Sequence, residues 1–229
     1  MARVTESATI RANAERVRDR IASAGGDPAS IRLVAVTKAH PATTVRAALD
    51  AGLVDVGENY AQELVAKASE VEAEVEVEVE VEPRWHFIGQ LQRNKVRQIA
   101  PVVHLWQSVD RLRLGEEIAR RQPGAAVLVQ VNLTDDQGRG GTRPGLTAGL
   151  VEGLRDLGLD VRGLMAVAPE GDEAMARAGF RVVRELADRL SLVERSIGMS
   201  EDFEAAVKEG STMVRIGSAL FGARPRLAS

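Results

Sequence analysis

The stretch IRLVAVTKAHP, residues 31–41, joins an apolar run to a single cationic side chain at its end. Six of the seven residues before Lys38 are Ile, Leu, Val, Ala or Thr, without the alternation of a strand that has one face in water. Such a run is typical of a strand buried on both faces, as in the parallel sheets of α/β proteins. The stretch therefore predicts a parallel α/β fold with Lys38 at the end of its first strand.

The same pattern recurs along the chain, where short apolar runs alternate with amphipathic helical segments. The predicted strands cover residues 31–37, 53–57, 85–89, 102–107, 126–132, 161–167, 195–199 and 212–216. Helices are expected near 42–51, 60–71, 92–100, 110–121, 145–157, 172–190 and 201–209, after a leading helix over 5–24. Eight such units predict one domain over residues 1–229, a single (β/α)8 TIM-type barrel with an extra N-terminal helix. An open doubly wound sheet is the alternative, although no GxGxxG follows the first strand.

One segment breaks this rhythm. EVEAEVEVEVEVEP, residues 70–83, alternates valine and glutamate with a period of two. The pattern fits either an edge strand or an extended flexible loop, and we favour the loop because the closely spaced carboxylates repel one another. No chemistry is assigned to it.

Composition limits the class of protein. The 30 Lys and Arg residues and 33 Asp and Glu residues give a net charge of −3 with no basic block, so nucleic acid is not an expected partner. There is no cysteine, which excludes disulfides and thiolate metal sites. Neither a signal-peptide core nor an apolar run long enough to span a membrane is found. We expect a soluble, cytoplasmic protein with no membrane partner, and a monomer because no large apolar surface stripe is evident.

In a parallel barrel the carboxyl ends of the strands form the active face, so polar residues there are the first candidates for function. The candidates are Lys38, Glu58, Asn59, His86, Gln90, Gln107, Ser108, Asn132, Met165 and Ser200.

Lys38 has three possible roles. It can be structural, with its stem buried and its ammonium in water. Desolvation in an apolar barrel mouth can instead lower its pKa and free the amine for Schiff-base chemistry. As a fixed cation it can also bind a phosphate without any change in pKa.

The C-terminal stretch SIGMSEDFEAAVKEGSTMVRIGSALFG, residues 196–222, contains two predicted helix starts. Ser200 precedes an acidic first turn, which is typical of an N-cap, and Gly217 and Ser218 lie between the last strand and another helix. Both features also occur in purely structural roles. Together, beside a lysine on the first strand, they favour an anion site such as a phosphate pocket.

Arg215 lies two residues before Gly217, so both face the same side of the last strand. An inward arginine in an apolar barrel requires an acceptor, because an unpaired buried guanidinium is costly. A ring nitrogen would serve, and the carboxylate of Glu58 is the competing partner.

These residues stand in motifs that resemble a known family. The blocks LVAVTKAHP, DVGENYAQELVAKA, WHFIGQLQRNK, LVQVN, GLMAV and SIGMSEDFEAAVKEGSTMVRIGSALFGARP look like those of the YggS/PROSC-type pyridoxal phosphate homeostasis proteins, from about Ile31 to Pro225. The resemblance implies a barrel similar to the alanine racemase N-terminal domain, with pyridoxal 5′-phosphate (PLP) as cofactor. By motif, it implies a Schiff base on Lys38, a ring-nitrogen contact from Arg215, a phosphate site at Ser200, Gly217 and Ser218, and a cofactor lining that includes Asn59 and Met165.

Arg215 limits what such a cofactor can do. An arginine donates to the ring nitrogen and cannot keep it protonated, so the ring is a weak electron sink. Tyr60 is the only tyrosine, and the chain has no second domain to supply another acid or base. The resemblance therefore implies a protein that carries PLP in vitamin B6 homeostasis and passes it to apo-enzymes, without robust catalysis. A small amino-acid racemase is the alternative, and a phosphate-binding barrel without PLP is a third possibility.

The sequence departs from the family pattern in places. Asp136 and Arg139 stand where glutamate and lysine are usual, and Arg195 replaces an apolar residue. His86 and Asn132 belong to family blocks but receive no individual role.

Overall fold

All eight expected strands are present in the computed structural model of the chain, which describes residues 2–78, 81–134, 136, 138–169 and 171–222. The strands are β1 (Arg32–Val36), β2 (Asp55–Glu58), β3 (Arg84–Phe87), β4 (Val103–Val109), β5 (Ala126–Val131), β6 (Asp160–Ala166), β7 (Glu194–Met199) and β8 (Met213–Ile216). The helices are α1 (Ala2–Ser23), α2 (Ala42–Asp50), α3 (Ala61–Glu78), α4 (Val96–Ile99), α5 (Leu112–Arg121), α6 (Thr147–Asp156), α7 (Glu173–Arg189), α8 (Phe203–Lys208) and α9 (Ser218–Phe221). The 3₁₀ turns η1 (Arg93–Lys95) and η2 (Pro144–Leu146) precede α4 and α6.

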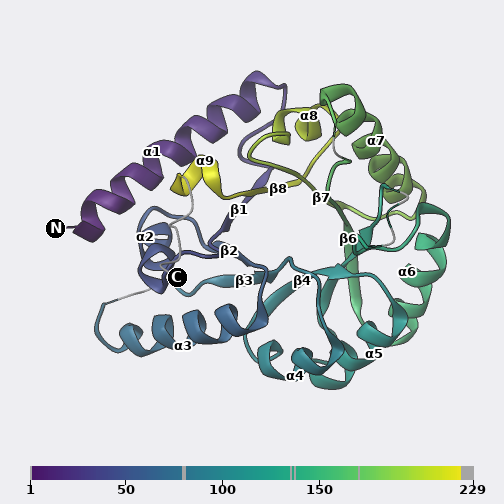
Figure 1. Cartoon of the computed structure of the whole chain (residues 1–229), viewed down its shortest axis with the longest axis horizontal. Helices are drawn as coiled ribbons and strands as arrows, with labels where there is room; N and C mark the ends of the chain where they lie inside the picture. Colours follow the sequence, from purple (N-terminus) through teal and green to yellow (C-terminus); the bar gives the residue numbers. More distant parts are fainter. Residues whose placement is uncertain (1, 79–80, 135, 137, 170, 223–229) are drawn as a thin grey trace.

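The strands form a closed parallel barrel in chain order (Figure 1). β1 pairs with β2 on one side and with β8 on the other, so no strand is left at an edge. The predicted (β/α)8 barrel with its extra N-terminal helix is confirmed. The open doubly wound sheet is wrong, because an open sheet has two unpaired edge strands. β4 ends two residues later than expected, at Val109, so Gln107 and Ser108 lie within the strand.

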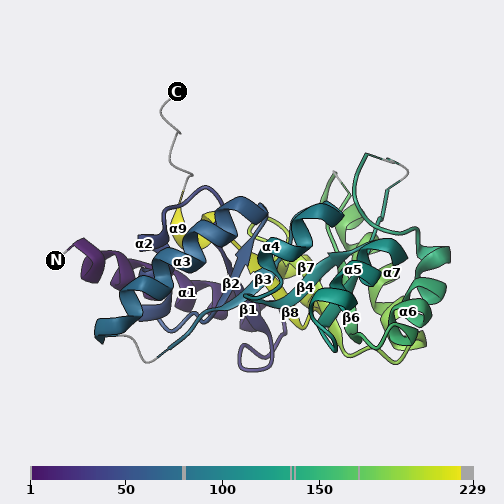
Figure 2. The same ribbon diagram turned by 90° about the horizontal axis from the view of Figure 1, so that it is seen from below.

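The leading helix completes the outer ring of helices. α9 has only four residues, and α1 packs beside it and α2, where Figures 1 and 2 both place it. Four apolar residues of α1 recur at helical spacing and are buried: Ile10, Ala14, Val17 and Ile21. They pack in one cluster with residues of α2, α8 and α9, among them Ala47, Phe203 and Leu220. α1 therefore covers the part of the barrel next to β1 and β8.

The apolar core has an outer and an inner part. The outer part lies between the strands and the helices and contains most of the buried side chains. The inner part, inside the barrel, is small: Val34, Leu105, Ala126, Leu128, Met165 and Met213. Much of the remaining interior is polar, and those side chains are described below.

The flexible loop expected over residues 70–83 is wrong for residues 70–78, because α3 continues to Glu78. Residues 79–80 lie outside the described residues, and residues 81–83 form no regular structure before β3. Glutamate favours helix, and a helix already nucleated at Ala61 extends at little cost. The closed barrel also leaves no free strand edge with which the repeat could pair.

No helix among the described residues has the length and apolarity needed to cross a membrane.

Candidate functional site

The pairing of β1 with its two neighbours brings several predicted site residues to one edge of the barrel. Ala35 lies opposite Ile216 of β8, and Val36 lies opposite Gly57 of β2. Lys38 and Asn59, each two residues further on, therefore leave neighbouring strands at the same level, and Gly217 and Ser218 leave β8 beside them. Lys38, Asn59 and Gly217 are half-buried, whereas Ser218 is exposed. The sequence prediction that these residues share the carboxyl face of the barrel agrees with this register.

The backbone on both sides of Lys38 is held by α3. The Lys67 ammonium donates to the carbonyl oxygen of Thr37 at 2.8 Å, and the amide of Ala39 donates to Glu63 Oε2 at 2.9 Å. Lys67 and Glu63 are themselves an ion pair one helical turn apart, at 3.3 Å. Ala39 has a φ of +62°, a conformation that costs energy for any residue with a Cβ. Lys38 thus sits in a turn fixed at both of its peptide bonds.

A buried ion pair anchors this arrangement to β2. Glu58, completely buried, accepts from Lys67 Nζ and from the hydroxyl of Thr37, both at 2.6 Å. Burial raises the pKa of Glu58, and the charge of Lys67 acts against that rise. The expectation that Glu58 competes as the partner of Arg215 is wrong, because this carboxylate is engaged by Lys67 and Thr37.

Arg215 enters the barrel interior from β8 and is almost completely buried. Its Nη1 donates to the carbonyl oxygen of Ser196 at 2.5 Å and to the hydroxyl of Ser196 at 2.8 Å, and its Nη2 donates to the carbonyl oxygen of Ala166 at 2.9 Å. Burial lowers the pKa of Arg215 to about 10, with the charge of Asp202 opposing the change, so it is a cation at neutral pH. No carboxylate of the described residues bonds to it. Three of its five N–H groups are used, which leaves two for a ligand.

Ser200 and Gly217 are linked, but not in the way the sequence predicted. The Ser200 hydroxyl accepts from the backbone amides of Gly217 and Ala219, each at 3.3 Å, and so caps the start of α9. The expected N-cap of the helix after Ser200 is wrong, because α8 begins only at Phe203. The intervening turn is instead closed by Asp202, whose Oδ1 accepts from the amide of Met199 at 2.5 Å. Because the Ser200 oxygen is the acceptor in both bonds, its O–H can still donate to a ligand in this corner, which consists of Ser200 and the turn at Gly217 and Ser218.

Asn59 is positioned by a close approach of the chain after β3. A Cβ built on Gly89 would lie 2.0 Å from the carbonyl oxygen of Asn59, so only glycine fits there. The buried Oδ1 of Asn59 has no hydrogen-bond partner among the described residues. An unsatisfied acceptor at the level of Lys38 is available to a ligand that carries a donor.

Met165 and Asn132 lie near the mouth in different settings. Met165 is buried within the inner apolar cluster, one residue before the carbonyl that binds Arg215. Asn132 organises the loop after β5: its Nδ2 donates to the carbonyl oxygens of Asp136 and Arg139 at 2.9 and 3.0 Å. Asn132 therefore has a loop-forming role within these residues. The departure at Arg195 has a local explanation, since its Nε donates to the carbonyl oxygen of Gly210 at 2.7 Å.

A cleft of about 960 Å³ opens beside this site, over the carboxyl ends of β5, β6 and β7. It is lined by residues that include Asn132, Val167, Met199 and Asp202, and extends to α1. Lys38 does not line the cleft, but Met199 and Asp202, on either side of Ser200 in the sequence, do, so the cleft borders the Ser200 corner.

The sequence interpretation missed the residues that support the site. Glu63 and Lys67 stand at i and i+4 on a helix, which ordinarily indicates a surface pair, and Ser196 begins the C-terminal motif without any sign of its role in the interior. The signal for Lys67 was available: Glu58, at the end of a buried strand, needs a cation, and Lys67 is nine residues away in the same block.

Comparison with known proteins identifies the family. A family model described as the alanine racemase N-terminal domain matches residues 6–225. A pyridoxal phosphate homeostasis protein from Pseudomonas aeruginosa is 42% identical over 219 residues, covering 92% of each chain. The protein of the same name from Escherichia coli strain K12 is 38% identical over 235 residues, covering 94% of this chain and 97% of that one. The chain belongs to the pyridoxal phosphate homeostasis protein family. The family predicted from the sequence motifs is confirmed.

Solved structures agree with this assignment. PipY of Synechococcus elongatus, determined with PLP bound, is 34% identical with a TM-score of 0.75 over 90% of this chain and 100% of its own. A protein of unknown function from Bifidobacterium adolescentis has 34% identity and a TM-score of 0.86 over 95% and 96% of the two chains. Alanine racemase from Corynebacterium glutamicum, 15% identical, has a TM-score of 0.67 over 97% of this chain and 63% of its own. The last comparison confirms the predicted likeness of fold.

Proposed function

We propose that this chain binds PLP at the mouth of the barrel, with the Lys38 amine as its covalent attachment point. In this proposal it holds and releases the cofactor in PLP (vitamin B6) homeostasis and does not turn over a substrate. The observation that carries the proposal is Arg215, a buried guanidinium held by Ser196 and Ala166 with two N–H groups left for an acceptor. The names of the relatives and the PLP bound in PipY support it.

The donors and acceptors at the mouth fit PLP. An amine is present at Lys38, the Ser200 O–H and the turn at Gly217 and Ser218 offer donors to a phosphate, and the Asn59 amide has an unsatisfied oxygen. When bound, PLP supplies an aldehyde carbon that joins the amine and a ring that can accept electrons. Arg215 would donate to the ring nitrogen, and Met165 would contribute to the apolar lining of the cofactor site.

The same residues favour carrying over catalysis. A guanidinium at the ring nitrogen keeps that nitrogen unprotonated, which weakens the ring as an electron sink. Tyr60, 60% exposed, follows Asn59 and so leaves the barrel on the β1–β2 side that also carries Lys38. It does not stand across the mouth from Lys38, where a racemase needs its second acid or base. We therefore place the racemase second.

The direct test is absorption spectroscopy with reduction. PLP added to the purified protein should give a visible band that borohydride converts to a stable adduct, and peptide mass analysis should place the adduct on Lys38. The chain has four lysines, so the assignment is unambiguous. Lys38→Ala should lose the band and Lys208→Ala, on an exposed lysine paired with Glu173, should keep it. No band in the unmodified protein would refute the proposal.

Two further measurements separate the alternatives. Deuterium incorporation at the Cα of L- or D-alanine at substrate-level turnover would favour a racemase. Retention of tight PLP binding by Lys38→Arg would favour a phosphate-binding barrel, because a guanidinium does not form the imine.

The proposal includes a cytoplasmic monomer, a single barrel domain over residues 1–229, that passes PLP to apo-enzymes. Light scattering of the loaded protein tests the oligomeric state. Recovery of activity by an apo PLP enzyme mixed with the loaded protein tests delivery, and a rate no faster than with free PLP would indicate sequestration instead.

A further inference from the structure

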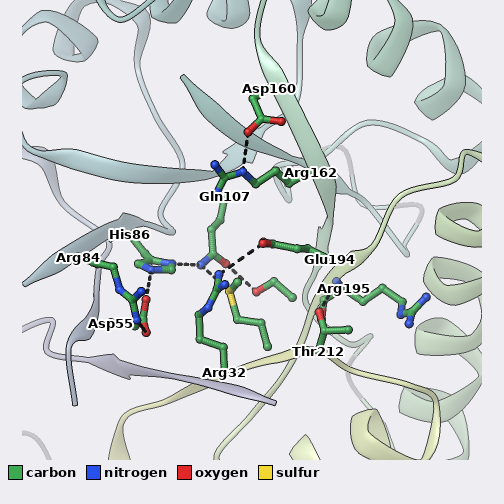
Figure 3. A network of polar contacts seen from close by, with 12 residues as sticks. Arg32, Asp55, Arg84, His86, Gln107, Asp160, Arg162, Glu194, Arg195 and Thr212 are labelled. Atoms are coloured by element: carbon green, nitrogen blue, oxygen red, sulfur yellow. Dashed lines mark hydrogen bonds and ion pairs between the residues drawn. The ribbon is translucent and has the colours of Figure 1, made fainter. Parts of the chain in front are cut away.

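A line of side-chain hydrogen bonds crosses the barrel interior behind Arg215. The Ser196 hydroxyl that binds Arg215 lies 2.6 Å from Gln107 Oε1, and Gln107 Nε2 lies 2.7 Å from His86 Nδ1. His86 Nε2 lies 2.9 Å from Asp55 Oδ1. Figure 3 shows Gln107, His86 and Asp55 meeting in this order inside the barrel. The five residues come from β8, β7, β4, β3 and β2, and all are buried.

The chemistry of the groups fixes the direction of every bond in this line. Asp55 also accepts from Arg84 Nη2 at 2.7 Å. Burial acts to raise the pKa of Asp55, but the hydrogen bond from His86 and the charges nearby outweigh it, so the carboxylate is charged and can only accept. His86 Nε2 must therefore carry a hydrogen. Burial lowers the pKa of His86, so the ring is neutral and its Nδ1 accepts from Gln107 Nε2.

With its amine toward His86, the Gln107 amide presents its oxygen to Ser196. The Ser196 hydroxyl donates to that oxygen, and the lone pairs of the same hydroxyl remain free to accept from Arg215 Nη1. The Sδ of Met213, 3.2 Å from Gln107 Nε2, is a weak acceptor and agrees with this amide orientation. The three middle groups, Ser196, Gln107 and His86, thus each donate one hydrogen bond and accept another, while Arg215 at one end only donates and Asp55 at the other end only accepts.

We propose that Gln107 and His86 are positioning residues for Arg215: they orient the Ser196 hydroxyl so that it accepts from the guanidinium and holds it for the ligand in the barrel mouth. This inference rests on the proposed function, because it takes the PLP ring nitrogen as that ligand. The line is directional, so loss of an acceptor at Gln107 removes the partner of the Ser196 O–H and lets the hydroxyl turn away from its present orientation. Arg215 then keeps only the carbonyl oxygens of Ser196 and Ala166.

Protonation of His86 would act on the same line. An imidazolium has a hydrogen on Nδ1, which would face the Gln107 amine, so the amide would have to turn over and present a donor to Ser196. Burial and the charge of Arg32 oppose the charged form of His86, whereas Asp55 and Glu194 favour it. Arg84, which is paired with Asp55, and the ring of His104, 6.1 Å away, are the other titratable neighbours. The neutral ring is therefore the form that supports Arg215.

The first experiment measures PLP affinity in the full-length protein. Gln107→Leu removes the amide that accepts from Ser196, and Ser196→Ala removes the hydroxyl. Each should raise the Kd for PLP about tenfold, the cost of one lost buried hydrogen bond. The double variant should bind PLP no more weakly than either single variant, because both substitutions break the same hydrogen bond between Gln107 and Ser196. Additive losses, or a wild-type Kd in both single variants, would overturn the proposal.

The second experiment determines the protonation state of His86 in the protein without PLP. The ¹⁵N NMR spectrum of the apo-protein at pH 7 should show His86 as the neutral Nε2–H tautomer, still neutral at a pH where free histidine is half protonated. His104→Gln serves as the matched control, since it removes a neighbouring ring outside the line and should leave both the tautomer and the PLP Kd unchanged. A Nδ1–H tautomer or an imidazolium at pH 7 would overturn the proposed bond directions. If the unmodified protein does not bind PLP, both the proposed function and the positioning role of Gln107 and His86 are refuted. The tautomer of His86 still tests the directions of the hydrogen bonds in the line.

Discussion

Replacing Lys67 by methionine should destabilise the protein far more than its place on an outer helix suggests. The change removes the charge and three contacts of the ammonium, to Glu58 at 2.6 Å, to the Thr37 carbonyl at 2.8 Å and to Glu63 at 3.3 Å, while conserving the shape of the side chain. Glu58 is left as a buried carboxylate with one hydroxyl donor. Breaking one side of a buried ion pair costs about 3–5 kcal/mol.

The free energy lost in Lys67→Met should depend on pH, because Glu58 can take up a proton. Without Lys67 the folded protein can relieve the buried charge by protonating Glu58, whose ordinary pKa is about 4.3. Protonation costs about 1.4 kcal/mol for each pH unit above that value, or about 3.7 kcal/mol at pH 7 and about 1 kcal/mol at pH 5. Burial already raises the pKa of Glu58 in the folded state, so the folded protein binds the proton where the unfolded chain does not. The loss of stability relative to the unmodified protein should therefore be smallest near pH 4 and grow as the pH rises.

Urea unfolding followed by circular dichroism at pH 5, 6, 7 and 8 measures this free energy. Arg120→Met is a suitable control, because the exposed Arg120 pairs with Glu117 at the surface, and its loss should have little effect on stability and change little between pH 5 and 8. The double variant Glu58→Gln with Lys67→Met should recover most of the loss, because no buried charge remains. If Lys67→Met costs no more than Arg120→Met, or costs the same at pH 5 and pH 8, the assignment of a buried charged pair is refuted.

Three further predictions concern single positions. Gly89→Ala should cost about 1–3 kcal/mol in urea unfolding and weaken PLP binding, since its Cβ would meet a backbone oxygen at 2.0 Å, whereas Gly149→Ala, with open space around it, should not destabilise. Ala39→Gly should be neutral or stabilising by up to about 1 kcal/mol, because glycine accepts a φ of +62° freely; Ala119→Gly in α5 should instead cost about 1 kcal/mol, and equal losses would disprove strain at Ala39. Glu209→Gln should cost about 1–2 kcal/mol at pH 7, since this buried carboxylate accepts from three arginines of α7 that are partly exposed. Burial acts to raise the pKa of Glu209, but the arginines outweigh it and lower that pKa. The stabilisation by Glu209 is therefore present above the ordinary carboxyl pKa and is lost on acidification. A difference in unfolding free energy from wild type that persists at pH 3 would contradict this.

Most of the fold could be predicted because the eight apolar runs and the helices between them are clearly separated along the chain. The strand bounds differ from expectation by at most two residues. Closure of the barrel could only be inferred from the number of units, and the pairing of β1 with β8 decides it. The repeat at 70–83 misled because its period of two suggests an extended chain, whereas helix propagation from Ala61 prevailed.

The site was predictable where a polar residue ends an apolar strand, as at Lys38 and Arg215. The interior line was not predictable, because β4 is buried along all of its length except at His104, and its pairing register with β5 shifts between Trp106 and Val109. Counting alternate residues along such a strand cannot tell whether Gln107 faces in or out. The cap provided by Ser200 was missed for a related reason: its partners, Gly217 and Ala219, are distant in the sequence.

The helix that fixes the backbone around Lys38 also carries the valine–glutamate repeat, which begins three residues after Lys67 and continues to the end of the helix. Eleven residues separate Lys67 from Glu78, about 16 Å along a straight helix. Each added Val–Glu pair would move the far end of α3 outward by about 3 Å, and each deleted pair would move it back by about 3 Å. Either change would rotate that end by about 200°. Residues 81–83, which have no regular structure, stand between that end and β3. The far end of α3 is thus the place to insert a fluorophore or an affinity tag, because its length can be varied without disturbing the amine.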